Sequence, residues 1–445
     1  MPTVGMISLG CARNQVDSET MLGSLKRNGF EIVDVKDCPQ ICIVNTCAFV
    51  KQAREESVEY ILGAASLKKS GKIKYLIVCG CLPQLYKEKL SQKLPEADLV
   101  LGTGDFPRIV DFIKGLGKKN RRRTLVSSAR SYLYDEFSPR FLLTPRHYAY
   151  VKISEGCSNF CSYCIISRLR GPFRSRPLES VVSEVKRLSK GGGLKEVILI
   201  GQDTTLFGLD RYGKAVFPNL LRAICGLKNS VRWVRVLYTH PAHYTDELIA
   251  VIRGEDKICK YLDLPVQHCS DRILKRMNRP TTKKHITELI DKLRRRIPRL
   301  ILRTSVIVGF PQETDRDFKE LLEFLKDTRF ERLGAFLYSK EAGTKASRLA
   351  GQVPEKVKED RMDELMRLQQ RLSRDLNMPR IGKIMDVLID EKIEGEKDKY
   401  LGRSEGDAPE IDGGVSVTGR TLEPGKFYKV RITDALEYDL EGRAL

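Results

Sequence analysis

Short apolar runs alternate with amphipathic helical patterns along the first 140 residues of the chain. The runs from Val4 to Cys11, Ile41 to Cys47 and Tyr75 to Cys81 are rich in β-forming residues and end at turn-like positions. Helical patterns cover Asp17 to Asn28 and Val50 to Lys69. This order predicts a parallel α/β sheet, and we expect residues 1–140 to form an N-terminal domain.

The alternation continues through residues 143–376, with helical patterns such as Leu178–Lys190 and Lys284–Arg296. The apolar runs of this part are Tyr148–Ser154, Glu196–Gln202, Trp233–Tyr238, Tyr261–Pro265, Ile301–Gly309 and Arg332–Tyr338. Six βα repeats are too few to close an eight-stranded barrel, so they predict an open six-stranded partial barrel. A charged helical connector follows over Arg361–Asn377.

Residues 378–445 have a different pattern. Lys383–Asp390, Val415–Thr418 and Phe427–Ala435 are β-rich, and glycines separate them. Short strands with frequent turns predict a small all-β barrel. The predicted fold class is therefore α/β, with a parallel N-terminal domain, a central partial barrel and a C-terminal β-barrel.

Composition supports a globular protein with a polyanionic partner. The chain has 445 residues, 41% hydrophobic and 31% charged, and a formal net charge of +20. It contains no uninterrupted apolar run of about 18 residues, the length of a membrane helix. The amino-terminal residues lack the basic and apolar regions of a secretory signal. We therefore expect a soluble, cytoplasmic protein with no membrane contact, and the charge favours nucleic acid as the first candidate partner.

The charge is unevenly distributed, which weakens that first candidate. Residues 378–445 carry 11 Lys and Arg against 15 Asp and Glu, so the basic excess lies in the preceding 377 residues. The basic run at 117–123 is either a solvated loop or a patch that faces phosphates. An acidic terminal barrel is unlike an RNA-binding module.

Three cysteines form the tightest group among the twelve of the chain. Cys157, Cys161 and Cys164 have C-x3-C-x2-C spacing, with no fourth Cys or His close by. A structural zinc site requires four protein ligands, usually in two pairs. Three thiolates on one loop suit a 4Fe–4S cluster with one open iron. The remaining alternatives are a zinc site and a loop of buried thiols.

This spacing resembles the motif of the radical S-adenosylmethionine (SAM) enzymes. In that family the open iron chelates SAM, and an electron from the cluster cleaves SAM to a 5′-deoxyadenosyl radical. The resemblance implies the open partial barrel and places Tyr163 near the adenine. It further implies cofactor contacts in the segments that contain Glu196, Gln202, Gln267 and Gly309.

Cys11, Cys47 and Cys81 lie far apart in sequence, each where an apolar run ends. Because the ends of parallel strands meet at one edge of a sheet, these thiols can converge. Cys79 is close enough to Cys81 to be an alternative ligand. The remaining cysteines have no partner spacing and are expected to pack in the core.

The sequence segments around these cysteines are SLGCARN, VNTCAFV and VCGCLPQ. They resemble the cysteine segments of the methylthiotransferases of the radical SAM class. The resemblance covers essentially the whole chain and identifies the last module as a TRAM domain. It selects Cys81 over Cys79 and implies a second 4Fe–4S cluster on Cys11, Cys47 and Cys81. The implied reaction replaces a C–H bond by C–S–CH3. It consumes SAM as methyl donor and as radical source, and it requires an electron donor and a sulfur donor. No catalytic side chain is assigned beyond the cluster ligands.

Two branches of this family have different substrates. One, the MiaB type, modifies adenosine in transfer RNA. The other, the RimO type, modifies the β-carbon of an aspartate in small-subunit ribosomal protein twelve, either free or within the ribosome. The segments 401–413 and 337–344 resemble the second branch. An acidic barrel also complements a basic ribosomal protein, so we expect Asp407, Glu410 and Asp412 to contact that partner unless they form a solvated turn. A non-catalytic iron–sulfur scaffold is a remote third alternative.

Overall fold

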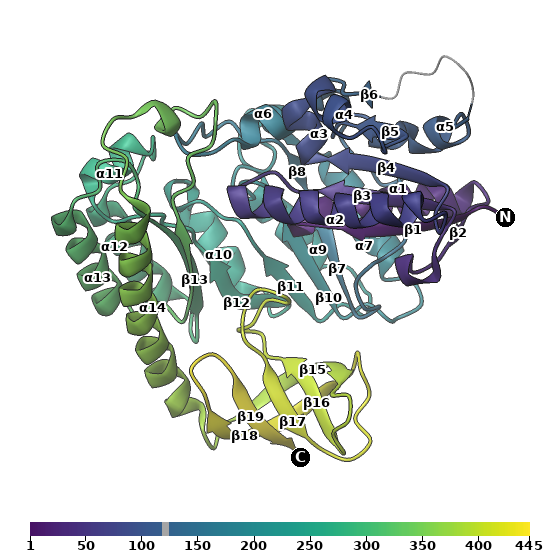
Figure 1. The fold of residues 1–445 in the computed structure, drawn as a ribbon. Coiled ribbons are helices and arrows are strands. Elements are labelled where there is room, and N and C mark those ends of the chain that lie inside the picture. The colour runs from purple at the N-terminus through teal and green to yellow at the C-terminus, as the bar shows by residue number, and fades with distance from the viewer. Residues whose placement is uncertain (118–123) are drawn as a thin grey trace.

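The computed structural model describes residues 1–117 and 124–445, arranged as two α/β layers and a small β-barrel (Figure 1). The run at 118–123, which contains most of the predicted basic patch, lies outside the described residues. Among the described helices, none is both long and apolar enough to cross a membrane.

The N-terminal layer is a six-stranded sheet in which all neighbouring strands are parallel. Its strand order is β2-β1-β3-β4-β5-β6. The strands are β1 Thr3–Ser8, β2 Glu31–Ile32, β3 Ile41–Thr46, β4 Tyr75–Gly80, β5 Leu99–Leu101 and β6 Thr124–Leu125. The helices are α1 Ala12–Arg27, α2 Lys51–Lys69, α3 Cys81–Tyr86, α4 Glu88–Lys93 and α5 Ile109–Ile113. Buried aliphatic clusters cover both faces of the sheet, as a parallel sheet requires.

The central layer is a second parallel sheet of six strands, in the order β14-β13-β12-β11-β10-β7. These strands are β7 Tyr148–Lys152, β10 Glu196–Ile200, β11 Trp233–Val236, β12 Ile258–Asp263, β13 Ile301–Val308 and β14 Arg332–Leu337. The edge strands β7 and β14 do not pair, so the predicted open barrel is confirmed. A short hairpin, β8 Ser154–Glu155 with β9 Arg174–Ser175, extends beyond β7.

Helices cover the outer face of the partial barrel (Figure 1). The helices of this part of the chain are α7 Leu178–Leu188, α8 Leu209–Tyr212, α9 Phe217–Cys225, α10 Asp246–Gly254, α11 Asp271–Arg276, α12 Lys283–Arg296, α13 Asp315–Thr328, and α6 Ile166–Arg170, which packs against the N-terminal domain. The long helix α14, Glu355–Asn377, runs from the barrel to the C-terminal module. It begins at Glu355, before the predicted connector, and its Leu365 is buried in the barrel core.

The C-terminal module is a closed five-stranded barrel in the order β15-β16-β17-β19-β18. Its strands are β15 Ile384–Lys392, β16 Lys399–Arg403, β17 Val415–Thr418, β18 Phe427–Ala435 and β19 Leu440–Ala444. The small all-β barrel is confirmed, although β16 and β19 carry too few apolar residues to be recognised in the sequence.

The loop between β16 and β17 packs against the amino ends of the central strands. Asp407 forms an ion pair with Arg332 at the start of β14 (2.7 Å). The Tyr261 hydroxyl donates to Asp412 (2.6 Å), and Tyr148 at the start of β7 donates to Glu410 (3.1 Å). The loop therefore closes the end of the partial barrel opposite to the carboxyl ends of the strands.

This packing corrects the prediction that three carboxylates of the loop face a partner protein. The Asp407 and Asp412 side chains are 1% and 3% exposed, and both already have partners within the chain. The prediction is wrong for these two residues, because their charges neutralise arginines of the barrel. Glu410 is exposed, and its contact with a partner stays a prediction.

Candidate active site

The first cysteine group lies on the loop that follows β8, beyond the carboxyl end of β7. The Asn159 amide donates to the Cys157 sulfur (3.5 Å), and the amide of Cys164 donates to the carbonyl of Cys161 (3.0 Å). Gly156 allows the loop to turn, since its φ is +75° and a Cβ there would lie 2.1 Å from the Pro172 oxygen. The loop therefore brings three thiols to one side of the barrel.

Burial raises the pKa of two of these thiols. The pKa of Cys157 is raised to about 11 and that of Cys164 to about 12, in each case mainly by burial and further by the neighbouring thiols. Mutual electrostatic effects show that the three sulfurs are close together. Without metal, Cys157 and Cys164 hold their protons, and iron binding would displace those protons.

The second cysteine group forms where three strands of the N-terminal sheet end. The register aligns Ser8 with Asn45 and Asn45 with Cys79, so Cys11, Cys47 and Cys81 follow at one edge. A Cβ on Gly10 would lie 2.8 Å from the Cys47 sulfur, which shows how closely β1 approaches this thiol. The predicted convergence at one sheet edge is therefore present.

The two groups of thiols differ in their electrostatic surroundings. Burial raises the pKa of Cys47 to about 12, and the thiols of Cys81 and Cys11 add to that effect. Burial would also raise the pKa of Cys11, but the charges of Arg13 and Arg170 hold it below its ordinary value. The second group thus has two arginines beside it.

Cys79 packs away from this edge. It is fully buried among the apolar residues on the α1 side of the sheet, whereas Cys81 belongs to the cluster on the other side. The strand ends at Gly80, whose φ is +101°, and the chain turns into α3 at Cys81. The turn separates the two thiols, which would share a face if the strand continued.

Arg170 connects the two cysteine groups. It lies on α6, shortly after Cys164, and its Nη2 donates to the Cys81 sulfur (3.6 Å) and to Asn14 Oδ1 (3.1 Å). Its Nη1 forms an ion pair with Asp17 on α1. The segment that carries one cysteine group therefore also contributes a charge to the other.

Four of the predicted cofactor residues lie beyond the carboxyl ends of the barrel strands. Gln202 follows β10 and donates to Glu155 (3.2 Å), and the amide of Gly309 after β13 donates to Glu313 (2.9 Å). Gln267 bridges to β13 with a φ of +70°, and Tyr163 lies in the cysteine loop beside an apolar cluster. The structure thus brings these four residues to the side of the first cysteine group.

Glu196 lies at the opposite end, and its predicted cofactor contact is wrong. It is the first residue of β10, and its carboxylate accepts from Arg235 and from Arg403 (both 2.6 Å). A loop that precedes a strand belongs to the amino end of a parallel barrel, whereas cofactor loops follow the strands. Glu196 instead joins the barrel to the C-terminal module.

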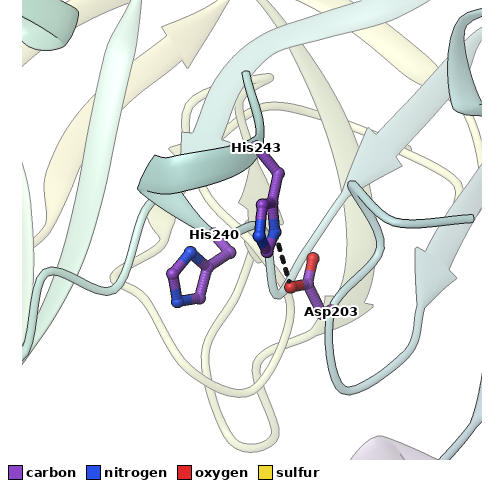
Figure 2. Close-up of side chains that lie close together, drawn as sticks. All are labelled: Asp203, His240 and His243. Atoms are coloured by element: carbon purple, nitrogen blue, oxygen red, sulfur yellow. Dashed lines mark hydrogen bonds and ion pairs between the residues drawn. The ribbon is translucent and has the colours of Figure 1, made fainter. Parts of the chain in front are cut away.

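Sequence reasoning missed a cluster of Asp203, His240 and His243 at the carboxyl ends of β10 and β11. Figure 2 shows the rings of the two histidines side by side, with His243 directed at Asp203. Asp203 Oδ2 lies 2.9 Å from His243 Nδ1 and accepts from Asn159 of the cysteine loop (2.8 Å). Asp203 follows β10, and both histidines follow β11, the next strand. A position just after consecutive parallel strands is the sequence signal that would have identified them.

The three side chains lie close enough together to hold a metal ion, and Asp203 and His240 already form hydrogen bonds within the chain. His240 Nδ1 accepts from the Ala242 amide (3.2 Å), and Asp203 also binds Thr205. Burial, with the nearby charge of Arg279, lowers the pKa of His240 to about 2, so its ring is neutral. The cluster is therefore best described as a hydrogen-bonded support for the cysteine loop through Asn159.

A pocket of about 530 Å³ opens beside this loop. Its lining residues are Asn159, Asp271, Lys275, Asn278, Arg279, Pro280, Thr281 and Thr282. The Asn278 side chain donates to the carbonyls of Asn159 and Phe160, so the pocket wall that contains Asn278 is hydrogen-bonded to the cysteine loop. The site is thus accessible from the side of α11.

Three family models match successive parts of the chain. Residues 3–102 match Uncharacterized protein family UPF0004, residues 151–325 match the Radical SAM superfamily, and residues 381–445 match the TRAM domain. These matches correspond to the sheet, the partial barrel and the C-terminal barrel described above.

Curated relatives match over nearly the full length. The "Ribosomal protein uS12 methylthiotransferase RimO" of Desulforamulus reducens is 47% identical, covering 99% of each chain. The protein of the same name from Clostridioides difficile is 45% identical, covering 100% of this chain and 99% of its own.

A solved structure shares the fold. The radical SAM methyltransferase TsrM from Kitasatospora setae matches with a TM-score of 0.56 at 14% identity, over 76% of this chain and 73% of its own. At this identity the match concerns the fold alone.

Proposed function

Because this chain belongs to the RimO family of radical SAM methylthiotransferases, we propose that it methylthiolates the β-carbon of an aspartate in ribosomal protein uS12. The observation that carries the proposal is the presence of two cysteine groups, one at the edge of the sheet and one beside the barrel, linked by the hydrogen bond from Arg170 to Cys81. Relatives whose names state this activity match 99% of the chain or more.

We assign one 4Fe–4S cluster to Cys157, Cys161 and Cys164, and the second to Cys11, Cys47 and Cys81. Each group offers three thiols within electrostatic reach of one another, and three protein ligands leave one iron of a cluster open. The second trio is drawn from three separate strand ends. A rigid sheet edge thus holds its geometry, whereas a single loop holds the first.

When bound, SAM and the two clusters supply the methyl group, the radical and the sulfur for the reaction. The chain provides the positions of these groups. Tyr163, Gln202, Gln267 and Gly309 are assigned to the SAM site, since all four lie on the side of the first cysteine group. Glu155 is held by Lys152 Nζ (2.6 Å), which fixes the strand that leads into Cys157.

The chemistry of the target requires no general base. The hydrogen removed from an aspartate β-carbon has too little acidity for a histidine or carboxylate to abstract it. Asp203 and His243 are paired with each other, and His240 is neutral. Through the hydrogen bond from Asn159 to Asp203, these residues support the cysteine loop.

We also propose where the protein acts in the cell and where its three domains begin and end. We place the protein in the cytoplasm, where it meets uS12 free or within the small subunit, together with an electron donor and a sulfur donor. The N-terminal methylthiotransferase domain spans residues 1–140, the radical SAM domain 143–376 and the TRAM domain 378–445.

The test offers two substrates to one enzyme preparation. Anaerobically reconstituted protein is incubated with SAM, a reductant and a sulfide source, in the presence of small ribosomal subunits, free uS12 and transfer RNA. Mass spectrometry should find one added methylthio group on an aspartate of uS12. Modification of transfer RNA with unmodified uS12 would contradict the proposal and favour the adenosine-modifying branch.

A further inference from the structure

Arg13 lies at the boundary between the N-terminal sheet and the partial barrel. It is in the first turn of α1, two residues after Cys11, and its Nη1 donates to the Gly201 carbonyl at the end of β10 (2.6 Å). Its guanidinium carbon lies 4.3 Å from the centre of the Tyr238 ring, which follows β11. The side chain is thus fixed across the domain boundary, at the edge of the barrel where the cysteine loop lies.

This position lies between the two cysteine groups. On one side the charge of Arg13 lowers the pKa of Cys11, two residues before it. On the other side, Gly201 adjoins β8, since a Cβ on Gly201 would lie 2.6 Å from the Ser154 hydroxyl. The charge of Arg13 also acts on Cys157 and Cys164 of the first group. A substrate that loses hydrogen at one group and gains sulfur from the other must occupy the same boundary.

Arg13 lacks the counter-ion that neighbouring arginines have. Arg170 is paired with Asp17, Arg140 with Glu19 and Arg176 with Glu184. Within residues 1–117 and 124–445, no carboxylate forms an ion pair with Arg13. A guanidinium has five N–H donors, and its contacts with Gly201 and Cys11 leave several free. It matches a carboxylate in charge and in geometry.

We propose that Arg13 binds the side-chain carboxylate of the substrate aspartate and so holds its β-carbon between the two cysteine groups. This inference rests on the proposed function. It assigns to Arg13 the preference of the enzyme for an aspartate substrate. Stacking on Tyr238 and the bond to Gly201 fix the plane of the guanidinium. A neutral nucleobase offers no group that needs this charge.

The test measures binding to two forms of one partner. The target aspartate of uS12 is first mapped in the reaction of the unaltered enzyme, and uS12 with that residue changed to asparagine is then prepared. Dissociation constants of both forms are measured with reconstituted enzyme in the absence of reductant. The unaltered enzyme should prefer the aspartate form about tenfold or more, the range of a charge-assisted hydrogen bond.

Three variants give the comparison. Arg13→Gln should bind both forms of uS12 alike, whereas Arg13→Lys retains a charge and should keep most of the preference. Arg222→Gln is the matched control, because Arg222 is 46% exposed and pairs with Glu247 on the outer helices. It should discriminate as the unaltered enzyme does.

The outcomes separate this inference from the function on which it rests. An Arg13→Gln protein with full iron content that still prefers the aspartate form would overturn the inference alone. If Arg13→Gln and Arg13→Lys lost affinity equally for the aspartate and asparagine forms of uS12, the inference would also be overturned, because that pattern indicates a structural role. Modification of transfer RNA instead of uS12 by the unaltered enzyme would overturn the proposed function together with the inference.

Discussion

The guanidinium of Arg170 donates a hydrogen bond to the sulfur of Cys81 across the boundary between the two α/β layers, with a distance of 3.6 Å. Arg170 follows the first cysteine loop, whereas Cys81 belongs to the second cysteine group. Both side chains are buried, so the interaction is little screened by solvent. The charge of one module therefore acts directly on the cysteine group of the other.

Removal of this charge should change the redox behaviour of the second cluster. Reduction adds negative charge, which a neighbouring arginine stabilises, so Arg170→Gln should lower the midpoint potential of that cluster by on the order of tens of millivolts. The potential is measured by a redox titration followed by electron paramagnetic resonance. Arg170→Lys should shift it less.

The control for this prediction is the exposed Arg222→Gln variant, which should leave both potentials unchanged. A potential in Arg170→Gln equal to that of the unaltered protein, at equal iron content, would show that the hydrogen bond has no electronic effect.

Loss of the first cysteine group should abolish radical initiation. Replacement of Cys157, Cys161 and Cys164 by alanine removes every thiol of that loop, so about half of the iron should be lost. Cleavage of SAM to 5′-deoxyadenosine should stop. Iron content and nucleoside formation are the two measurements, and Cys38→Ala is the control because Cys38 is exposed and lies outside both groups. Unchanged iron content would contradict the assignment.

Loss of the second group should separate radical formation from product formation. Replacement of Cys11, Cys47 and Cys81 by alanine should remove the other half of the iron and abolish methylthiolation. Abortive cleavage of SAM should persist, since the first loop is untouched. A variant that still forms the methylthio product would show that the sulfur is held elsewhere in the protein.

The sequence predicted the starts of most strands closely, because β-branched runs mark buried parallel strands without long-range information. The start of α1 was less accurate, since the structure begins this helix at Ala12 and the pattern indicated Asp17. The first turn of α1 faces a buried polar boundary and not an apolar core. Its residues Arg13 and Asn14 therefore break the apolar periodicity on which the prediction depended.

The convergence of the two cysteine groups could be predicted from the sequence, whereas the charges around them could not. Cysteine spacing and position at strand ends are local signals, and parallel topology converts them into proximity. Arg170 and Arg13 lie close to cysteines in sequence, but their contacts with Cys81 and Gly201 depend on how the two layers pack. Glu196 was misplaced for a different reason, because its segment precedes a strand and so lies at the amino end of the barrel.

The pairing of Asp407 with Arg332 should hold the C-terminal barrel in place. Asp407→Ala leaves a buried arginine without its counter-ion, a change that costs about 3–5 kcal/mol in comparable pairs. Trp233, the only tryptophan of the chain, reports on this interface because its ring contacts Phe427 of β18 at 4.7 Å between centres. The variant should show a red-shifted tryptophan emission and a lower thermal midpoint.

Glu410→Gln is the matched control for this interface, since Glu410 lies in the same loop but is exposed. It should change stability by less than about 0.5 kcal/mol. Equal effects of the two substitutions would show that the buried ion pair does not anchor the module.

The same interface should weaken in acid. Burial alone would raise the pKa values of three carboxyl groups, Glu196, Asp390 and Asp407, but neighbouring cations hold all three below their ordinary values. Arg403 and Arg235 lie beside Glu196, and His147 and Arg403 lie beside Asp390. Arg332 lies beside Asp407. A carboxyl group with a lowered pKa in the folded state contributes its stability above its ordinary pKa.

That contribution is lost as the pH falls through the folded-state value. The ordinary values are 4.5 for Glu196 and 3.8 for the two aspartates, so docking of the barrel should be constant near neutral pH and should decline below about pH 4.5. Burial raises the pKa of Asp412, so protonation of this group in acid favours the folded state. This opposes the effect of the other three carboxyl groups, which outnumber it. The measurement is the emission maximum of Trp233 between pH 7 and pH 3. A maximum that stays constant to pH 3 in the unaltered protein would show that these carboxylates do not control the docking of the C-terminal barrel.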